Sequence, residues 1–347
     1  MGVTPLYMTF WSVLRTITAP FPQKMYRIGD DVMFSQYMRL LLFFFHTYVN
    51  PKVYVYGDIK ALMEKDENVI YLSNHQCTVD WIVATMLSEQ RQCTGTVRYI
   101  MKDGLKLLPI YGFYCYQHGC IFVGKSGKFK KQKLDKQLQD IRSNNIPIWL
   151  VIFPEGTRFN PELHQVVHKS KQFAIESGYK ELQHVLTPRT LALKSSLQQL
   201  QDHVSAVYDV TIAYTNTFDN VKRERTPSYG MPEYLLGKSS EIHLNVERID
   251  IKDIPTDEKQ LNDWLYNQFV KKDRLLSEFY NPDSVNFEKF PGQSSILEVK
   301  KRRTIPPFLF YSLSLAAIMS TSQTRNLYWK ISLVISVGGI VWVSIRS

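Results

Sequence analysis

Short apolar runs alternate with amphipathic stretches through the middle of the chain. The runs are rich in β-branched and aromatic residues, which is typical of buried strands. The stretches between them carry apolar residues three to four positions apart, which predicts helices. The strands are expected at residues 53–56, 69–72, 97–101, 120–123, 148–153, 204–214 and 241–248, and the helices at 33–49, 79–90, 128–144, 165–177, 189–201 and 257–280. This alternation predicts an α/β fold with a mixed sheet flanked by helices.

The C-terminal part of the chain is apolar enough to enter a bilayer. After the basic tetrad KKRR at 300–303, no charged residue occurs before Arg325, and the apolar runs cover 307–321 and 331–345. Each run is near the lower length limit for spanning, so a transmembrane pair, a re-entrant hairpin and two buried core helices remain open. The basic tetrad favours a membrane hairpin with the main domain on the cytosolic side.

These patterns divide the chain into four parts. Residues 1–50 are expected to form a membrane-associated helical region, and residues 51–280 the main α/β domain. Residues 281–303 are polar and irregular, which predicts a linker that ends in the basic cluster. Residues 304–347 form the predicted C-terminal membrane hairpin.

Composition narrows the possible partners. The chain of 347 residues has a formal net charge of +10 and a pI of about 9.2, which favours an anionic partner. No interleaved aromatic and basic platform of a nucleic-acid-binding module occurs, so a membrane surface or a phosphorylated substrate is the better match. The four cysteines form no CxxC pair and no cluster with metal-ligand spacing, which indicates reduced thiols.

Candidate chemistry begins at the end of the predicted strand 69–72, in the segment NHQCTVD. His75 is able to accept a proton near neutral pH, and Asp80 is able to orient and charge-balance it. Side chains five positions apart meet neither in one helix nor in one strand, so the chain must bend between them, with Thr78 a candidate helix cap. Such a dyad without a neighbouring serine suits a reaction in which the substrate supplies the nucleophile. Cys77 is the alternative nucleophile, but no environment that would lower its pKa is visible.

A second polar cluster, FPEGTR, follows the predicted strand 148–153. Arg158 offers a planar fork for a phosphate, Gly156 allows close backbone approach, and Glu155 either holds Arg158 or contacts the ligand. In α/β sheets, ligands gather at the carboxyl ends of strands, where both clusters lie. A lysine-rich stretch from Lys125 to Lys133 is either a solvated helix face or a contact for anionic headgroups or coenzyme phosphates.

NHQCTVD followed by FPEGTR resembles the signature pair of the glycerolipid acyltransferase family, whose first motif is His-x4-Asp. Both motifs, their order and their placement at strand ends agree, and the resemblance runs from about residue 37 to the C-terminal hairpin. The resemblance implies the mixed α/β domain of this family, preceded by a helical element that lies against the membrane. Residues 25–49 are the candidate for this element. It also implies an integral protein of endoplasmic reticulum, nuclear envelope or mitochondrial membranes.

The resemblance implies a reaction as well. His75 would deprotonate the sn-2 hydroxyl of 1-acyl-sn-glycerol-3-phosphate (lysophosphatidic acid), which attacks the carbonyl of acyl-CoA, a co-substrate, with no bound cofactor and no metal. Asp80 would orient His75. The other implied binding residues are Glu155, Gly156, Thr157 and Arg158 for the glycerol phosphate, Gly119, Phe122 and Lys125 in a second motif, and Pro188 and Arg189 in a fourth.

Two departures from the family pattern leave alternatives open. The second motif usually carries arginine where Lys125 stands, so another lysophospholipid such as lysocardiolipin is an alternative acceptor. The N-terminal apolar segment is also short for an anchor. A non-catalytic lipid-binding membrane protein is the third alternative, and its mark would be a missing dyad member, but both His75 and Asp80 are present.

Overall fold

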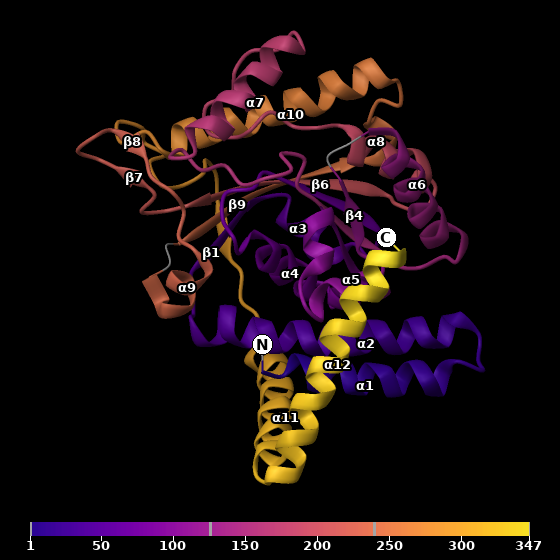
Figure 1. Ribbon diagram of the computed structural model, residues 1–347. Helices are drawn as coiled ribbons and strands as arrows, with labels where there is room; N and C mark the ends of the chain where they lie inside the picture. Colours follow the sequence, from indigo (N-terminus) through magenta and orange to yellow (C-terminus); the bar gives the residue numbers. More distant parts are fainter. Residues whose placement is uncertain (1, 125–126, 239–240, 347) are drawn as a thin grey trace.

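Eight strands form one mixed sheet at the centre of the molecule (Figure 1). The structure, a computed structural model, describes residues 2–124, 127–238 and 241–346. The strand order is β10-β1-β9-β6-β2-β5-β3-β4. The strands are β1 Val53–Gly57, β2 Val69–Ser73, β3 Val97–Lys102, β4 Ile121–Val123, β5 Trp149–Ile152, β6 Ala206–Tyr214, β9 Ile242–Asp250 and β10 Ser294–Ile296. The seven strands predicted from the sequence are all confirmed, each to within about two residues at either end.

The strand directions make the sheet mixed, as predicted. β2 pairs in parallel with both β5 and β6, β3 pairs in parallel with β5 and β4, and β1 with β9. The antiparallel pairs are β6 with β9 and β1 with β10. Because β2, β5 and β6 are parallel neighbours, their carboxyl ends meet at one edge of the sheet.

Helices cover both faces of this sheet (Figure 1). Along β2, Val69 and Tyr71 belong to the core on one face, with α1, α2, α4 and α5, while Ile70 and Leu72 belong to the core on the other, with α6, α8 and α10. This double burial explains why the central strands are apolar throughout. The helices are α1 Thr4–Thr18, α2 Gln23–Leu42, α3 Ile59–Glu64, α4 Asp80–Gln90, α5 Tyr111–His118, α6 Gly127–Ser143, α7 His164–Glu176, α8 Leu191–Leu200, α9 Met231–Glu233, α10 Glu258–Phe279, α11 Lys301–Met319 and α12 Ser322–Arg346.

Some predicted elements differ from the structure. The helix predicted at 33–49 is α2, which begins ten residues earlier at Gln23 and ends in a π-helical turn, Phe43–Tyr48. The predicted linker 281–303 contains β10, which pairs with β1 at the sheet edge. The helix α5 and a small hairpin of β7 (Phe218–Asp219) and β8 (Glu224–Arg225) were not predicted. Short elements such as these carry too few residues for a periodic pattern.

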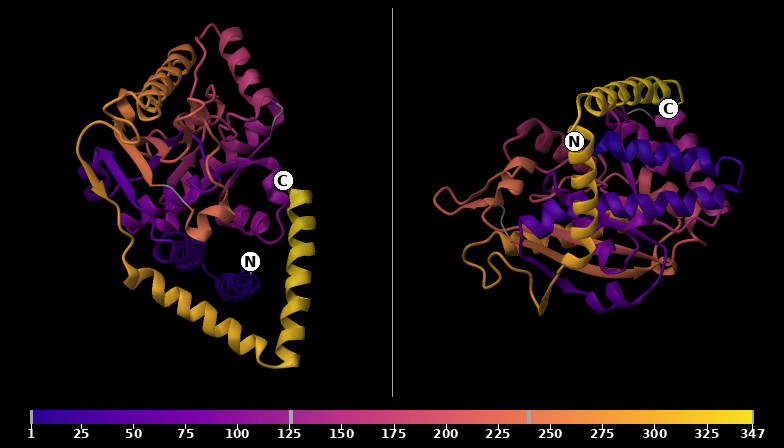
Figure 2. Two further views of the ribbon diagram at one scale, coloured as in Figure 1. Left: turned by 90° about the vertical axis from the view of Figure 1, so that its left-hand side faces the viewer. Right: turned by 90° about the horizontal axis from the view of Figure 1, so that it is seen from below.

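The C-terminal segment forms two helices, α11 and α12, which diverge like a V around the α1–α2 pair (Figure 2). Within the described part of the chain, one helix is long and apolar enough to cross a membrane, over Ser322–Ile345 of α12. Toward its end, α12 packs on α5, where the ring of Trp342 meets those of Phe113 and Tyr116 edge-on. Tyr328, Ser332 and Val343 of α12 are buried, whereas Leu333, Val334, Val337, Val341 and Ile345 are exposed.

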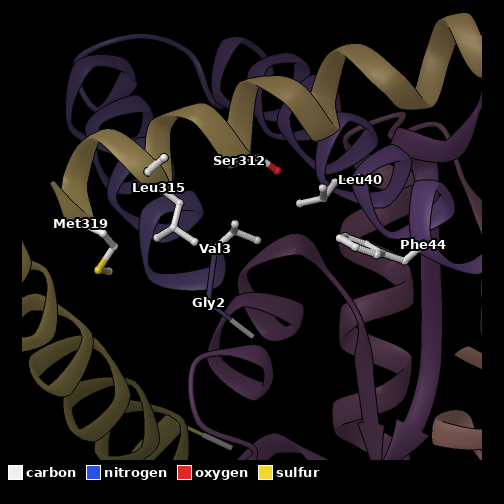
Figure 3. A pocket seen from close by; sticks show the side chains of 8 residues that line it. Gly2, Val3, Leu40, Phe44, Ser312, Leu315 and Met319 are labelled. Atoms are coloured by element: carbon white, nitrogen blue, oxygen red, sulfur yellow. The ribbon is translucent and has the colours of Figure 1, made fainter. Parts of the chain in front are cut away.

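An apolar pocket of about 480 Å³ lies where α11 passes the start of the chain and the end of α2. Figure 3 shows the side chains of Val3, Leu40, Phe44 and Leu315 around it. Ser312 contributes the one side-chain polar group of its lining. The lining of the pocket is therefore almost entirely apolar.

A buried charge network fastens α2 to the sheet. The Arg98 guanidinium on β3 donates to Asp31 Oδ1 at 2.6 Å and to His118 Nε2 at 2.6 Å. His118 Nε2 is thus an acceptor, and its Nδ1–H donates to Asp30 Oδ2 at 2.7 Å. Burial and the charge of Arg98 lower the pKa of His118, which keeps that ring neutral. Trp11 of α1 also donates to Asp30, so both N-terminal helices are tied to the main domain.

We expect Arg98→Ala to destabilise the protein strongly. It breaks the pair of the buried Arg98 with Asp31 and leaves the buried ring of His118 without its donor, and removing one partner of a buried pair costs about 3–5 kcal/mol of unfolding free energy. Denaturant unfolding in detergent measures the change. The matched control is Arg142→Ala, which removes a surface pair with Asp202 and should change the unfolding free energy by less than about 1 kcal/mol. An equally small effect for Arg98→Ala would contradict the anchoring role.

Candidate active site

The loop between β2 and α4 is pinned to the neighbouring strand β6. The side chain of Asn74 bonds the main chain of Ile212 in both directions, donating to its carbonyl at 3.0 Å and accepting from its N–H at 2.8 Å. The loop that carries His75 therefore starts from a fixed position. Thr78 does not cap α4, because Val79 occupies that position and makes no side-chain cap bond.

His75 and Asp80 meet, as the sequence predicted. His75 Nδ1 lies 2.7 Å from Asp80 Oδ2. The Asp80 side chain is fully buried, while that of His75 keeps 21% of its surface exposed. Since Nδ1–H is directed at the carboxylate, Nε2 is left as the free acceptor of the ring. Phe153 stacks on the imidazole with the ring centroids 4.6 Å apart, which holds its plane.

Three further donors hold the carboxylate of Asp80. Its Oδ2 accepts the main-chain N–H groups of Gln76 at 2.6 Å and Cys77 at 2.9 Å, and its Oδ1 accepts the hydroxyl of Tyr214 at 2.5 Å. Burial and then the charge of Asp80 raise the pKa of Tyr214, so its phenol keeps the proton that it donates. Tyr214 was not identified from the sequence; it ends β6, 134 positions from Asp80.

Glu155 braces the loops from within. Its Oε1 accepts the main-chain N–H of His75 at 2.7 Å, and its Oε2 accepts that of Leu186 at 2.9 Å. Burial raises the pKa of this carboxyl, and the two amides oppose that shift. Of the two roles predicted from the sequence, holding Arg158 is not seen: no ion pair among the described residues joins the two. Both oxygens face main chain, so a contact of Glu155 with ligand stays a prediction.

The rest of the FPEGTR segment lies at the rim. Gly156 is exposed and has a φ of 65°, a backbone conformation that favours glycine. Thr157 is half-buried, and Arg158 is exposed. The next residue, Phe159, donates its N–H to the carbonyl of His75 at 2.8 Å, which places Arg158 beside the dyad. Among the described ion pairs, none includes Arg158, so its guanidinium is available to an anion.

The fourth predicted segment joins the same loops, whereas the described residues of the second, Gly119 and Phe122, lie at the end of α5 and on β4. Arg189 donates its N–H to the carbonyl of Pro154 at 3.0 Å, with its guanidinium 5.4 Å from the Phe173 ring, and Pro188 is buried. Gly119 ends α5 with a φ of 97°, next to Arg98. Phe122 is buried on β4, from which β3 and β5 separate β2. Lys125 lies outside the described residues.

The thiol alternative does not fit the surroundings of Cys77. Burial raises the pKa of this thiol to about 12, and its Sγ donates to the carbonyl of Tyr229 at 2.9 Å. A protonated, buried thiol is a poor nucleophile. The group that remains exposed is the imidazole of His75, which is able to take a proton from a bound hydroxyl.

We expect Glu155→Ala to loosen the site and to lower stability. The variant leaves the N–H groups of His75 and Leu186 without an acceptor, at a cost of about 1–3 kcal/mol for each buried group left unpaired. Denaturant unfolding measures the loss. Glu162→Ala, at an exposed position of the same loop, is the control and should unfold like the parent protein. Parent-like stability of Glu155→Ala would exclude the bracing role.

Comparison with known proteins agrees with this geometry. Residues 52–214 match the family described as acyltransferase, and residues 233–311 match the acyltransferase C-terminus. The chain is 38% identical to the mouse 1-acyl-sn-glycerol-3-phosphate acyltransferase epsilon, over all of this chain and 94% of the relative. The sequence phrases around His75 and Arg158 also resemble this epsilon type, and the comparison confirms that resemblance.

Two other proteins show more distant similarity. The probable 1-acyl-sn-glycerol-3-phosphate acyltransferase 5 of Arabidopsis thaliana is 31% identical over 80% of this chain and 70% of its own length. The crystal structure of the 1-acyl-sn-glycerophosphate (LPA) acyltransferase PlsC from Thermotoga maritima aligns with a TM-score of 0.41 and 18% identity, covering 79% of this chain and 95% of that one. On the matches over its full length, the chain belongs to the acyltransferase family.

Proposed function

We propose that this protein transfers an acyl chain from acyl-CoA to the sn-2 hydroxyl of 1-acyl-sn-glycerol-3-phosphate, giving phosphatidic acid and free CoA. The observation that carries the proposal is the contact of 2.7 Å between His75 and the buried Asp80, with the exposed Arg158 beside them. The names of the relatives support the acceptor, since they are described as 1-acyl-sn-glycerol-3-phosphate acyltransferases.

The dyad suits direct transfer. Nε2 of His75 accepts the proton of the acceptor hydroxyl as its oxygen attacks the thioester carbonyl. Asp80 balances the imidazolium that forms, and its other donors keep it in place for this step. When the tetrahedral intermediate collapses, the sulfur of CoA leaves and takes the proton back from His75. No covalent enzyme intermediate is needed, because the acyl donor is already activated.

The phosphate of the acceptor is assigned to the rim beside His75. Arg158 supplies a planar cation there, and the open main chain at Gly156 lets a phosphate approach closely. Thr157 and the exposed Arg189 complete this group. The roles of Gly119, Phe122 and Lys125 rest on the sequence resemblance alone.

We also propose that the protein works at a bilayer, with acyl-CoA reaching it from the cytosol. Exposed apolar side chains gather on α1, α2, α11 and α12, which share one end of the molecule (Figures 1 and 2). The apolar pocket of Figure 3 opens among these helices, and the basic residues 300–303 stand at the start of α11. Endoplasmic reticulum, nuclear envelope and mitochondrial membranes are the locations that the resemblance implies.

One observation favours a second acceptor. Lysine at position 125, where the family usually has arginine, replaces a bidentate phosphate contact by a point charge. Acceptors with another headgroup, such as lysocardiolipin, would use the same dyad. Initial rates with lysophosphatidic acid, lysocardiolipin and lysophosphatidylinositol at equal acyl-CoA separate the two functions. A purely lipid-binding role is disfavoured by the intact dyad.

We expect His75→Ala to abolish acyl transfer while the protein stays folded. Loss of a general base lowers the rate by about 10²–10⁴-fold. The assay follows CoA release from purified protein in detergent with lysophosphatidic acid and a panel of acyl-CoAs. His168→Ala on the exposed side of α7 is the matched control and should keep parental activity. Turnover of His75→Ala within tenfold of the parent would remove the proposed base.

We expect Arg158→Ala to weaken acceptor binding. Loss of a charge-assisted contact with phosphate corresponds to a KM for lysophosphatidic acid about 10–100-fold higher, with the KM for acyl-CoA little changed. Initial-rate kinetics with each substrate varied in turn measure both. Arg274→Ala, an exposed arginine of α10, should leave both constants unchanged. An unaltered acceptor KM in Arg158→Ala would refute the phosphate role.

A further inference from the structure

A segment outside the two family matches reaches into the candidate site. Residues 215–232 lie between the matched regions 52–214 and 233–311. They leave the end of β6, form the β7–β8 hairpin with Phe218 opposite Arg225, and lead into α9 (Figure 1). This segment therefore lies outside both family matches, although it contacts the loop that carries the first motif.

The segment contacts the two residues that follow His75. Arg225 Nη2 donates to Gln76 Oε1 at 3.1 Å, and the carbonyl of Tyr229 accepts from Cys77 Sγ at 2.9 Å. The other end of the Gln76 amide donates to the carbonyl of His184 at 2.9 Å. The Gln76 side chain is buried and held at both ends.

Arg225 is a cation without a carboxylate partner. None of the ion pairs formed by the described residues includes it; its guanidinium lies 3.4 Å from the centre of the Tyr280 ring. Its Nη1 donates to His184 Nδ1 at 3.4 Å, and its Nε to the carbonyl of Thr217 at 3.4 Å. Burial and the charge of Arg225 lower the pKa of His184 to about 3, so this ring is a neutral acceptor. The nearby Asp273 accepts main-chain N–H groups of residues 183 and 184 instead.

The contacts form a continuous path to the dyad. Arg225 fixes the side chain of Gln76, and the main-chain N–H of Gln76 donates to Asp80 Oδ2 at 2.6 Å. The N–H of Cys77, whose thiol the same segment holds, donates to that oxygen at 2.9 Å. That oxygen is also the one that holds His75. A shift of Gln76 would therefore turn the carboxylate and, with it, the imidazole.

We propose that Arg225 is a positioning residue for the His75–Asp80 dyad, acting through Gln76 from a segment that neither family match covers. Its fork spans Gln76 and His184 at once, while Tyr280 stabilises its charge in place of a carboxylate. The inference rests on the proposed acyl transfer, because it assigns a role within that reaction.

Kinetics of Arg225→Ala, Gln76→Ala and the double variant test the proposal. Arg225→Ala should lower kcat about tenfold, the effect of one lost charge-assisted hydrogen bond, with the KM of both substrates within about twofold of the parent value. The double variant should be no slower than the slower single variant, because both changes remove one contact. Arg223→Ala, two residues away in the same hairpin and paired with Asp283 at the surface, is the control and should be unaffected.

Arg225→Lys keeps a cation over the Tyr280 ring, but a single ammonium group does not reach both Gln76 and His184. This variant should therefore stay folded and show a similar fall in kcat. Parental kcat in Arg225→Lys, a raised KM with unchanged kcat, or additive losses in the double variant would each overturn the proposal. A raised KM would make Arg225 an anion ligand instead.

Amide hydrogen exchange gives a readout that needs no activity. Residues 74–80 should exchange faster in Arg225→Lys and Arg225→Ala than in the parent, and at the parental rate in Arg223→Ala. Unchanged exchange in the Arg225 variants would overturn the positioning role. Absence of acyl transfer by the parent protein, with faster exchange in these variants, would instead overturn the proposed reaction and leave the contact path supported.

Discussion

The candidate site depends on one buried carboxylate. Asp80 is fully buried, and a carboxyl group at that depth is tolerated only when donors surround it. Here the donors come from the loop after β2, from the ring of His75 and from Tyr214 on β6. The need to satisfy this group therefore determines the bend of the loop and the direction of the imidazole.

The sheet explains why these groups meet. β2 lies between β5 and β6 and is parallel to both, so the NHQCTVD loop, the FPEGTR loop and Tyr214 all emerge at one edge. Glu155 then joins the loop of His75 and the loop of Leu186 through main-chain amides, and Arg189, in the same loop as Leu186, bonds Pro154. Hydrogen bonds to the main chain therefore hold the loops together. The side chains of His75 and Arg158 are not used in these bonds and remain accessible to a ligand.

The sequence predicted the strands and the dyad because both are local. Apolar runs mark strands that are buried on both faces, and the spacing of His75 and Asp80 demands a bend. Tyr214 and Arg225 were missed because their partners lie 134 and 149 positions away, which one sequence does not reveal. The polar first half of α2 shows no helical apolar face, since Asp30 and Asp31 are used in pairing with His118 and Arg98. Tertiary contacts decided each of these features.

The network around Arg98 has a mechanical consequence. It connects α1 and α2 to β3 and α5 through buried charges, which resist the sliding that apolar packing alone would allow. The N-terminal pair and the sheet should then tilt as one body, without a hinge between them. If α1 and α2 lie on a surface, this rigid connection fixes the distance between that surface and the ring of His75. A lipid in such a surface would then have to move out of it to reach the ring.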